Sequence, residues 1–281
     1  MHPYTLLDVF ADEPLAGNGL AVVHDADHVT DEVMLRFARE TRLAETTFVQ
    51  APRAPEADYR NRIWTVAEEV PFAGHPSLGT AVAVALRSGE TEVTYTQETH
   101  AGLQPVTVSR AGDRASASML QGPVDFKEEL DVDEVMAAIG LAPDAAHPDW
   151  APQLVTTGLT ALIAPLALAD ALGRIRPDRA AVEALHPERF NLYLFAYDGE
   201  GGRARARSIP SRPAESEDPA TGSAVAPLLA YLKPRTGDER IEVWQGVEIG
   251  RPSRLTAELE GDQVRVSGDV IVVATGELRL P

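Results

Sequence analysis

The 281-residue sequence contains no cysteine, and this absence excludes several kinds of chemistry at once. A chain without thiols forms no disulfide, offers no thiolate nucleophile and builds no metal site from cysteine ligands. The sequence also lacks a Walker-type phosphate loop and a G-x-S-x-G nucleophile elbow. These absences set aside thiol enzymes and the enzyme classes that those two motifs mark.

Long hydrophobic runs are absent as well. The longest apolar stretches, 159–168 and 224–232, are far shorter than the ~20 residues that a membrane-spanning helix needs. The first residues lack the basic, then apolar, then small-residue order of a secretory signal. We therefore expect a cytoplasmic protein that has no membrane partner.

Positive charge is scarce: 25 Lys and Arg stand against 43 Asp and Glu, which gives a formal net charge of -18. Such a chain would repel the phosphates of a nucleic acid, so we expect no nucleic-acid partner. The negative charge is spread along the sequence and does not by itself identify a substrate. The hydrophobic fraction of 44% is ordinary for a globular protein, here one large domain or two of moderate size.

The first half of the sequence alternates strand and helix patterns. Residues 31–42 predict a helix with Thr30 as its N-cap, and 77–87 predict a second helix. The second helix is apolar on almost every face, which indicates a helix surrounded by protein. Segments rich in β-branched and aromatic residues predict strands at 4–11, 20–24, 45–49 and 60–66.

The second half repeats this order loosely. Strand patterns at 192–197 and 203–209 precede a glycine-containing turn and another apolar helix at 224–232. We interpret this as a duplicated α/β (α+β) unit, in which each half is a curved sheet wrapped around a central helix. The predicted domains are 1–121 and 122–269, and the pattern leaves open whether a last strand at 270–281 returns to the first domain.

A glycine-rich turn stands immediately before each apolar helix. Gly74-His75-Pro76 precedes the first helix, and Thr221-Gly222-Ser223 opens the second. Glycine lets backbone N–H groups approach a ligand closely, and a helix N-terminus favours an anion. The two turns together predict that backbone amides and the Ser223 hydroxyl bind an anionic group such as a carboxylate. The alternative is ordinary capping by Thr221 or Ser223, with His75 at the cap position of its own helix.

Three ionisable side chains near these turns are candidates for moving a proton. His75 belongs to the residue type that titrates near neutral pH. Asp218 precedes Pro219, which favours an extended backbone and could turn the carboxylate inward. Glu45 stands at the start of a predicted strand beside apolar residues, where a carboxyl can serve as acid and base in turn. A plain surface role is the alternative for each of them.

Other charged residues are interpreted as structural. Glu217 is expected in solvent. Arg203, Arg205 and Arg207 form one basic face of a predicted strand, and this face is also expected in solvent. One of these arginines could instead reach a substrate carboxylate.

Two further patterns resemble ligand sites but do not meet their requirements. Gly17-Asn18-Gly19 lacks the third glycine of a dinucleotide fingerprint and precedes a strand instead of a helix. His24 and His28 have the spacing of metal ligands on a helix, yet they lie in a polar loop. We therefore expect neither a cofactor nor a metal.

Several pieces of sequence, taken in order, resemble one known family. They are Asp8-Val9-Phe10 with 15–18 and 20–23; 45–48; 71–76 with 78–81; 217–224; and Gln245-Gly246 with 250–253. In this order they resemble the phenazine-biosynthesis isomerase-like (PhzF-like) family, relatives of diaminopimelate epimerase. The pieces span nearly the whole chain, and the Gly-His-Pro and Asp-Pro-Ala-Thr-Gly-Ser pieces are the most specific.

The resemblance implies a fold and a set of roles. It implies two similar domains, each with a mostly antiparallel or mixed sheet rolled around a central helix, an active site in the cleft between them, and a homodimer. Glu45 matches the acid/base carboxylate of the family, and His75, Asp218 and Ser223 match its other polar site residues.

The implied activity is cofactor-independent isomerisation of a small carboxylate-bearing metabolite, of the type carried out by trans-2,3-dihydro-3-hydroxyanthranilate isomerase. Gly74 and Gly222 match positions where epimerase relatives use thiol chemistry or bind the substrate carboxylate through backbone amides. Because this chain has no cysteine, a racemase mechanism with two thiols is excluded.

Two departures from the family pattern bear on the substrate. Asn18-Gly19 stands where members more often have Asn-Pro, and 207–210 lacks the Phe commonly found there. Two other functions remain open. One is an amino-acid racemase or epimerase with Asp218 as the second base, and the other is a small-molecule binding protein without catalysis.

Overall fold

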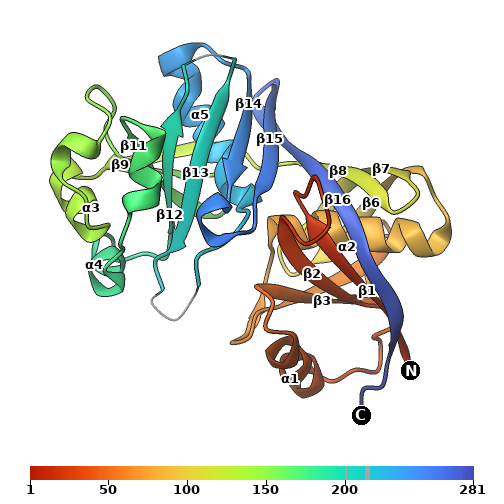
Figure 1. The fold of residues 1–281 in the computed structure, drawn as a ribbon. Helices are drawn as coiled ribbons and strands as arrows, with labels where there is room; N and C mark the ends of the chain where they lie inside the picture. Colours follow the sequence, from red (N-terminus) through yellow and green to blue (C-terminus); the bar gives the residue numbers. More distant parts are fainter. Residues whose placement is uncertain (200, 213–215) are drawn as a thin grey trace. The chain divides into compact units, whose positions relative to one another are not determined.

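The computed structural model describes residues 1–199, 201–212 and 216–281, which form two compact units. Unit 1 comprises residues 1–120 and 267–281, and unit 2 comprises 121–266. The long strand β16 (Gln263–Leu278) begins in unit 2 and continues into unit 1 (Figure 1). Both units combine a sheet with a central helix, so the predicted α/β fold is confirmed.

The sheet of unit 1 closes on itself. Its strands follow the order β1-β2-β3-β4-β6-β7-β8-β16, and β16 also pairs with β1 along its length. The short β5 pairs only with β4. The elements are β1 (His2–Val9), β2 (Asn18–Val23), α1 (Asp31–Thr41), β3 (Glu45–Gln50), β4 (Tyr59–Trp64), β5 (Glu69–Val70), α2 (Gly74–Ser88), β6 (Glu92–Thr99), β7 (Gly102–Ala111) and β8 (Arg114–Leu120).

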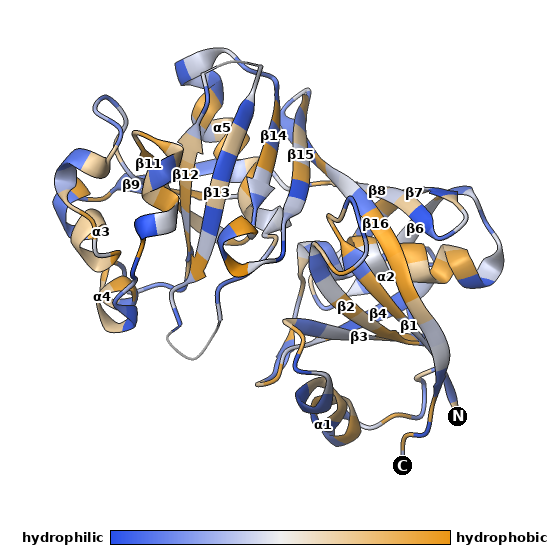
Figure 2. Ribbon diagram, in the orientation of Figure 1, coloured by the Kyte–Doolittle hydropathy of each residue, from blue (hydrophilic) through white to orange (hydrophobic). Residues whose placement is uncertain are grey.

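Helix α2 is the core of unit 1. It contacts β1, β2, β3, β4, β6, β7 and β8, and residues 75–83 are buried without interruption. Figure 2 shows α2 mainly in the colour of hydrophobic residues, whereas α1 carries a hydrophilic face. Gly79 allows the close approach to the sheet, because a Cβ there would lie 2.5 Å from Leu20 Cδ2 and 2.8 Å from Val9 Cγ2.

Unit 2 is built around α5 (Gly222–Thr236), which contacts β10, β11, β14 and β15. The sheet follows the order β15-β14-β13-β12-β11-β10-β9. The remaining elements are β9 (Asp125–Glu129), α3 (Val132–Ala138), η1 (Pro143–Ala145), β10 (Gln153–Thr156), β11 (Thr160–Leu166), η2 (Ala169–Arg174), α4 (Arg179–Ala184), β12 (Asn191–Tyr197), β13 (Arg203–Pro210), β14 (Arg240–Gln245), η3 (Val247–Ile249) and β15 (Ser253–Glu260).

The two sheets repeat one pairing pattern. In unit 1, β1–β2, β3–β4 and β6–β7 are antiparallel, while β2–β3 and β4–β6 are parallel. In unit 2, β10–β11, β12–β13 and β14–β15 are antiparallel, while β11–β12 and β13–β14 are parallel. The central helix precedes the last parallel strand in both cases, so α2 and α5 hold equivalent places.

Both central helices begin earlier than the sequence indicated. Helix α2 starts at Gly74, with Ala73 as its N-cap, and α5 starts at Gly222, with Thr221 as its N-cap. The prediction that His75 occupies the cap position was therefore wrong, because His75 lies inside the first turn. Glycine and proline weaken a helix interior, but the first turn tolerates both because its N–H groups have no intrahelical partner.

No helix among the described residues combines the length and the apolar character needed to cross a bilayer.

Candidate active site

Glu45 is the first residue of β3 and pairs with Leu20 of the parallel strand β2. Its side chain is 19% exposed, and the Oε2 atom is buried. The sequence prediction that a strand begins at this carboxyl is correct. A carboxylate at the end of a strand can therefore reach out of the sheet while one of its oxygens stays against protein.

His75 faces this carboxylate from the first turn of α2. Its Nε2 atom lies 3.5 Å from Glu45 Oε2, and its side chain is 6% exposed. The other ring nitrogen, Nδ1, lies 3.2 Å from Asn18 Nδ2. An amide nitrogen only donates, so Nδ1 accepts, and the proton of the neutral ring sits on Nε2, on the side of Glu45.

Burial decides the charge of His75. Removal from water lowers the pKa of the imidazole to about 3, because the charged form loses its hydration. The ring is therefore neutral at physiological pH, and the contact with Glu45 joins a carboxyl group to a neutral N–H. His75 can donate a hydrogen bond from Nε2, but it does not enter the site as an imidazolium.

The N-termini of the two central helices differ from those of the peripheral helices. Thr30, Asp131 and Asp178 cap α1, α3 and α4 through side-chain oxygens. Among the described residues, no side chain caps α2 or α5, and neither helix has an acidic residue in its first turn. Their first N–H groups therefore keep the capacity to bind an anion. Ordinary capping by Thr221, the alternative interpretation, does not occur.

The Thr221 hydroxyl instead joins a buried polar cluster in unit 2. It donates to Asp218 Oδ2 over 2.6 Å and accepts from Gln245 Nε2 over 3.0 Å. Gln245 also donates to the carbonyl oxygen of Asp218 over 2.7 Å. The Asp218 carboxylate, itself only partly buried, is thereby fixed at the start of α5. Ser223, in the first turn of the helix, is 8% exposed.

The loop before α5 corrects one prediction. Glu217 does not lie in solvent: its side chain is 13% exposed and accepts two hydrogen bonds from Arg207, from Nε over 2.9 Å and from Nη2 over 2.6 Å. Arg207 also donates to the carbonyl of Leu172 over 2.6 Å. Two N–H groups of the guanidinium bind the two carboxylate oxygens side by side, so Arg207 and Glu217 form a geometrically specific pair.

The arginines of the basic face predicted for β13 form ion pairs within unit 2. Arg207 is buried and binds Glu217, so its predicted solvent exposure was wrong. Arg205 pairs with Glu248, and Arg203 pairs with Asp198 over 3.1 Å. All three arginines have carboxylate partners in the protein itself.

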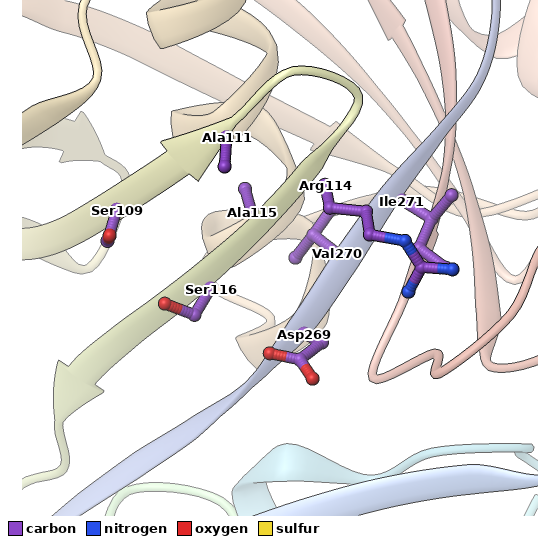
Figure 3. Close-up of a pocket in the computed structure, with 8 residues that line it drawn as sticks. All are labelled: Ser109, Ala111, Arg114, Ala115, Ser116, Asp269, Val270 and Ile271. Carbon is purple, nitrogen blue, oxygen red and sulfur yellow. The ribbon is translucent and has the colours of Figure 1, made fainter.

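Two open hollows lie elsewhere. One of about 280 Å³ in unit 1 is lined by residues of β7, β8 and β16 (Figure 3). Another of about 480 Å³ in unit 2 is lined by residues that include Tyr197, Arg205 and Trp244. None of the predicted site residues lines either hollow. The described residues contain no group of His, Asp and Glu suited to hold a metal ion.

Two polar residues of this arrangement were not identified as site residues in the sequence. Asn18 sets the tautomer of His75, and Gln245 connects Asp218 with Thr221. Both belong to motifs that carried the family resemblance, and this was the only signal for them. Their partners are distant in the sequence, so their roles became visible only in the fold.

Comparison with known proteins identifies the family of this chain. The model of the PhzC-PhzF family, described as phenazine biosynthesis-like protein, matches residues 7–276. A trans-2,3-dihydro-3-hydroxyanthranilate isomerase from Pseudomonas aeruginosa is 37% identical, over 95% of this chain and 94% of its own. The solved structure of a predicted epimerase from the same species has a TM-score of 0.86 and 34% identity, and each chain is covered completely.

A more distant structure shares the fold alone. A probable proline racemase from Agrobacterium radiobacter superimposes with a TM-score of 0.65 at 15% identity, covering 100% of this chain and 94% of its own. The family model matches nearly the whole chain, and the identity to the isomerase is more than twice the identity to the racemase. The chain therefore belongs to the PhzC-PhzF family of phenazine biosynthesis-like proteins.

Proposed function

We propose that this PhzF-family isomerase moves a proton between two carbons of a small carboxylate-bearing metabolite, with Glu45 as the acid/base. The observation that carries the proposal is the Glu45 carboxyl beside the neutral, buried His75, 3.5 Å away. A carboxylate can take a proton from carbon, hold it as a carboxylic acid and return it at another carbon. The reaction changes no oxidation state overall, so it needs no redox cofactor.

His75 has an orienting role in this proposal. Its neutral ring presents Nε2–H, which donates either to Glu45 or to an acceptor atom of the substrate. An imidazolium would compete with Glu45 as a proton donor, and the burial of His75 disfavours that form. The single proton in transit thus stays on Glu45.

The substrate carboxylate is assigned to backbone amides. We assign the amides of Gly74 at the start of α2 and of Gly222 and Ser223 at the start of α5 to this carboxylate. Thr221, whose own N–H donates to Gln245, belongs to the binding residues through its hydroxyl, which donates to Asp218. The absence of capping side chains at both helices supports this assignment. Partial positive charge at a helix N-terminus also stabilises the enolate-like charge that develops when a proton leaves carbon next to a carboxylate.

Asp218 is assigned to a hydrogen-bond donor of the substrate. The Thr221 hydroxyl donates to its Oδ2 atom over 2.6 Å, and Ala220 N donates to its Oδ1 atom over 3.4 Å. The side chain is only partly buried, and a carboxylate accepts several hydrogen bonds, so a hydroxyl or amino group of the substrate would add a further one.

The proposed substrate is trans-2,3-dihydro-3-hydroxyanthranilate. Relatives named as isomerases of this compound are 35–37% identical over nearly the full chain. The compound carries the carboxylate, hydroxyl and amino groups that the assigned residues would bind. Gly19 and the segment 207–210 depart from the usual family pattern, and these departures bear on the choice of substrate more than on the chemistry.

The proposal is tested by incubating the protein with this compound in heavy water and following the product by NMR. We expect a shifted double bond, with deuterium at the newly formed C–H in those turnovers in which the Glu45 carboxyl exchanges its proton with the solvent. Deuterium incorporation without a change of connectivity would instead support a racemase or epimerase. Binding with neither a shifted double bond nor deuterium would support a non-catalytic binding protein.

The cellular setting is also part of the proposal. We propose a homodimer, as the family resemblance implies, and a cytoplasmic location. Light scattering coupled to size-exclusion chromatography measures the mass in solution, and a mass of one chain at micromolar concentration would contradict the dimer. Fractionation of the source cells tests the location.

A further inference from the structure

Gln245, the last residue of β14, is completely buried and makes four hydrogen bonds through its side chain. Its Oε1 atom accepts from the Tyr193 hydroxyl over 2.9 Å and from Thr221 N over 3.2 Å. Its Nε2 atom donates to the Asp218 carbonyl over 2.7 Å and to Thr221 Oγ1 over 3.0 Å. The amide thus connects the core of unit 2 with the residues at the start of α5.

The backbone fixes which way this amide points. The N–H of Thr221 can only donate, so the atom facing it must be the amide oxygen. The carbonyl of Asp218 can only accept, so the atom facing it must be the amide nitrogen. Two independent backbone groups therefore exclude the flipped amide.

The orientation of the amide also determines the direction of the other hydrogen bonds around Gln245. With the amide oxygen facing Tyr193, the tyrosine hydroxyl must donate. Burial and the nearby Asp218 carboxylate raise the pKa of Tyr193, so its hydroxyl keeps this proton. The Gln245 nitrogen donates to Thr221 Oγ1, which turns the threonine proton toward Asp218 Oδ2.

A close backbone contact holds the loop against this amide. Gly246 follows Gln245 with a φ of 74°, and a Cβ there would lie 2.7 Å from the carbonyl oxygen of Pro219. The loop that carries Asp218 therefore packs directly on the backbone next to Gln245. A Cβ at position 246 would also lie 2.3 Å from the carbonyl oxygen of Arg251, so a side chain there would have to displace one or both of these segments.

We propose that Gln245 is a positioning residue that orders the hydrogen-bond chain Tyr193–Gln245–Thr221–Asp218 in one direction and so holds Asp218 Oδ2 as a hydrogen-bond acceptor. A proton on Oδ2 would meet the Thr221 proton head-on, so this oxygen is kept as an acceptor. The carboxyl group of Asp218 is thereby held in one orientation for a donor group of the substrate. This inference rests on the proposed function of Asp218.

The direct test detects the Thr221 hydroxyl proton by NMR in the protein without substrate. We expect a resonance in slow exchange with water in the wild type, and exchange at least about tenfold faster in Tyr193→Phe and in Gln245→Met. Tyr231→Phe is the matched control, because it removes another buried tyrosine hydroxyl of unit 2, one that donates to Ala151 O over 2.7 Å. An undetectable resonance in the wild type, or equal exchange in all variants, overturns the proposal.

Kinetics with trans-2,3-dihydro-3-hydroxyanthranilate supply the second readout. We expect Thr221→Val to lower kcat/KM by about 30-fold, Thr221→Ser to lose less, and Tyr193→Phe to lower it by about fivefold. A chain predicts that Tyr193→Phe has no further effect in the Thr221→Val background. Additive losses would mean separate structural roles and would overturn the proposal.

The two readouts separate the inference from the function on which it rests. The NMR measurement needs no turnover, so it reports on the chain even if the wild type is inactive on this compound. A confirmed chain with no loss of activity in Thr221→Val would refute the proposed function of Asp218. A missing chain in an active enzyme would refute only the role of Gln245.

Discussion

Nε2 of His75 lies 3.5 Å from Oε2 of Glu45, while Nδ1 of the same ring lies 3.2 Å from the amide nitrogen of Asn18. The asparagine thereby decides which face of the imidazole carries the proton, and burial keeps the ring neutral. The carboxyl proposed to move the proton thus has a neutral donor as its neighbour. This relationship links an amide at the start of β2 to the chemistry proposed for the start of β3.

Asn18→Asp should reverse the tautomer of His75. A carboxylate at position 18 would accept from Nδ1–H and leave Nε2 without a proton toward Glu45. It would also raise the pKa of His75 from about 3, because a negative neighbour stabilises the imidazolium. We expect kcat to fall by about 10- to 100-fold. Nitrogen-15 NMR of the labelled ring reports the tautomer and its titration directly.

Asn61→Asp is the control for this experiment, because it places the same group on β4 of unit 1, where Asn61 donates to Gln97 over 3.0 Å instead of to His75. It should leave the tautomer of His75 unchanged. An unchanged ring tautomer in Asn18→Asp would contradict the assigned role of Asn18.

His24 should make the protein less stable as the pH falls below neutral. It is buried beside Thr5, and burial, together with Arg87, lowers its pKa from 6.5 to about 4. Between these two values the unfolded chain binds the proton and the folded chain does not, so the free energy of unfolding falls as the pH drops through this window. At pH 5 the effect amounts to ~2 kcal/mol.

Urea unfolding of the wild type and His24→Gln at pH 7 and pH 5 measures this contribution. The loss between the two pH values should be smaller in His24→Gln by about that amount. Thr5→Val removes the partner of His24 but no titratable group, so its loss between the two pH values should resemble that of the wild type. Identical pH dependence in the wild type and His24→Gln would refute the prediction.

Gly79→Ala should destabilise unit 1 although alanine is the better helix former. The new methyl group would lie 2.5 Å from Leu20 Cδ2 and 2.8 Å from Val9 Cγ2. Overpacking of a core costs about 1–3 kcal/mol, which exceeds the helix-propensity gain of ~1 kcal/mol. Gly276→Ala, where nothing lies within 4 Å of the added Cβ, should be nearly neutral. Chemical denaturation gives both values, and equal stability of the two variants would contradict the packing argument.

Glu217→Leu should be strongly destabilising, because it leaves the buried guanidinium of Arg207 without its carboxylate. Breaking a buried ion pair from one side costs about 3–5 kcal/mol. The double variant Arg207→Met with Glu217→Leu should be less destabilised than Glu217→Leu alone, because it removes both charges. If Glu217→Leu unfolds at the same denaturant concentration as the wild type, the carboxylate is solvated after all.

The sequence was most informative where structure is local. The run of β-branched and aromatic residues from Glu45 onward predicted β3 from its first residue, and the apolar character of α2 predicted its place inside the sheet. The starts of α2 and α5 were placed too late, because glycine and proline have low helix propensity yet are accepted in a first turn.

Tertiary partners account for the rest. The sequence predicts that Glu217 is a solvent-exposed loop carboxylate. Its partner Arg207 gives no contrary signal, because the alternating pattern of its strand predicts that the arginine faces solvent. Asn18 and Gln245 have amide side chains, which do not by themselves indicate a role in a site. Their roles depend on hydrogen bonds to His75 and Asp218. The chemical role of Glu45 itself stays a prediction until a variant is measured.

The central claim is that the Glu45 carboxyl carries the proton. The most direct measurement compares Glu45→Gln with the wild type on trans-2,3-dihydro-3-hydroxyanthranilate in heavy water, with Glu92→Gln, the same change at the start of β6, as control. We expect Glu45→Gln to bind the compound with nearly wild-type affinity but to turn it over at least ~1000-fold more slowly, while Glu92→Gln stays fully active. Wild-type turnover by Glu45→Gln would refute the role of Glu45 as the acid/base.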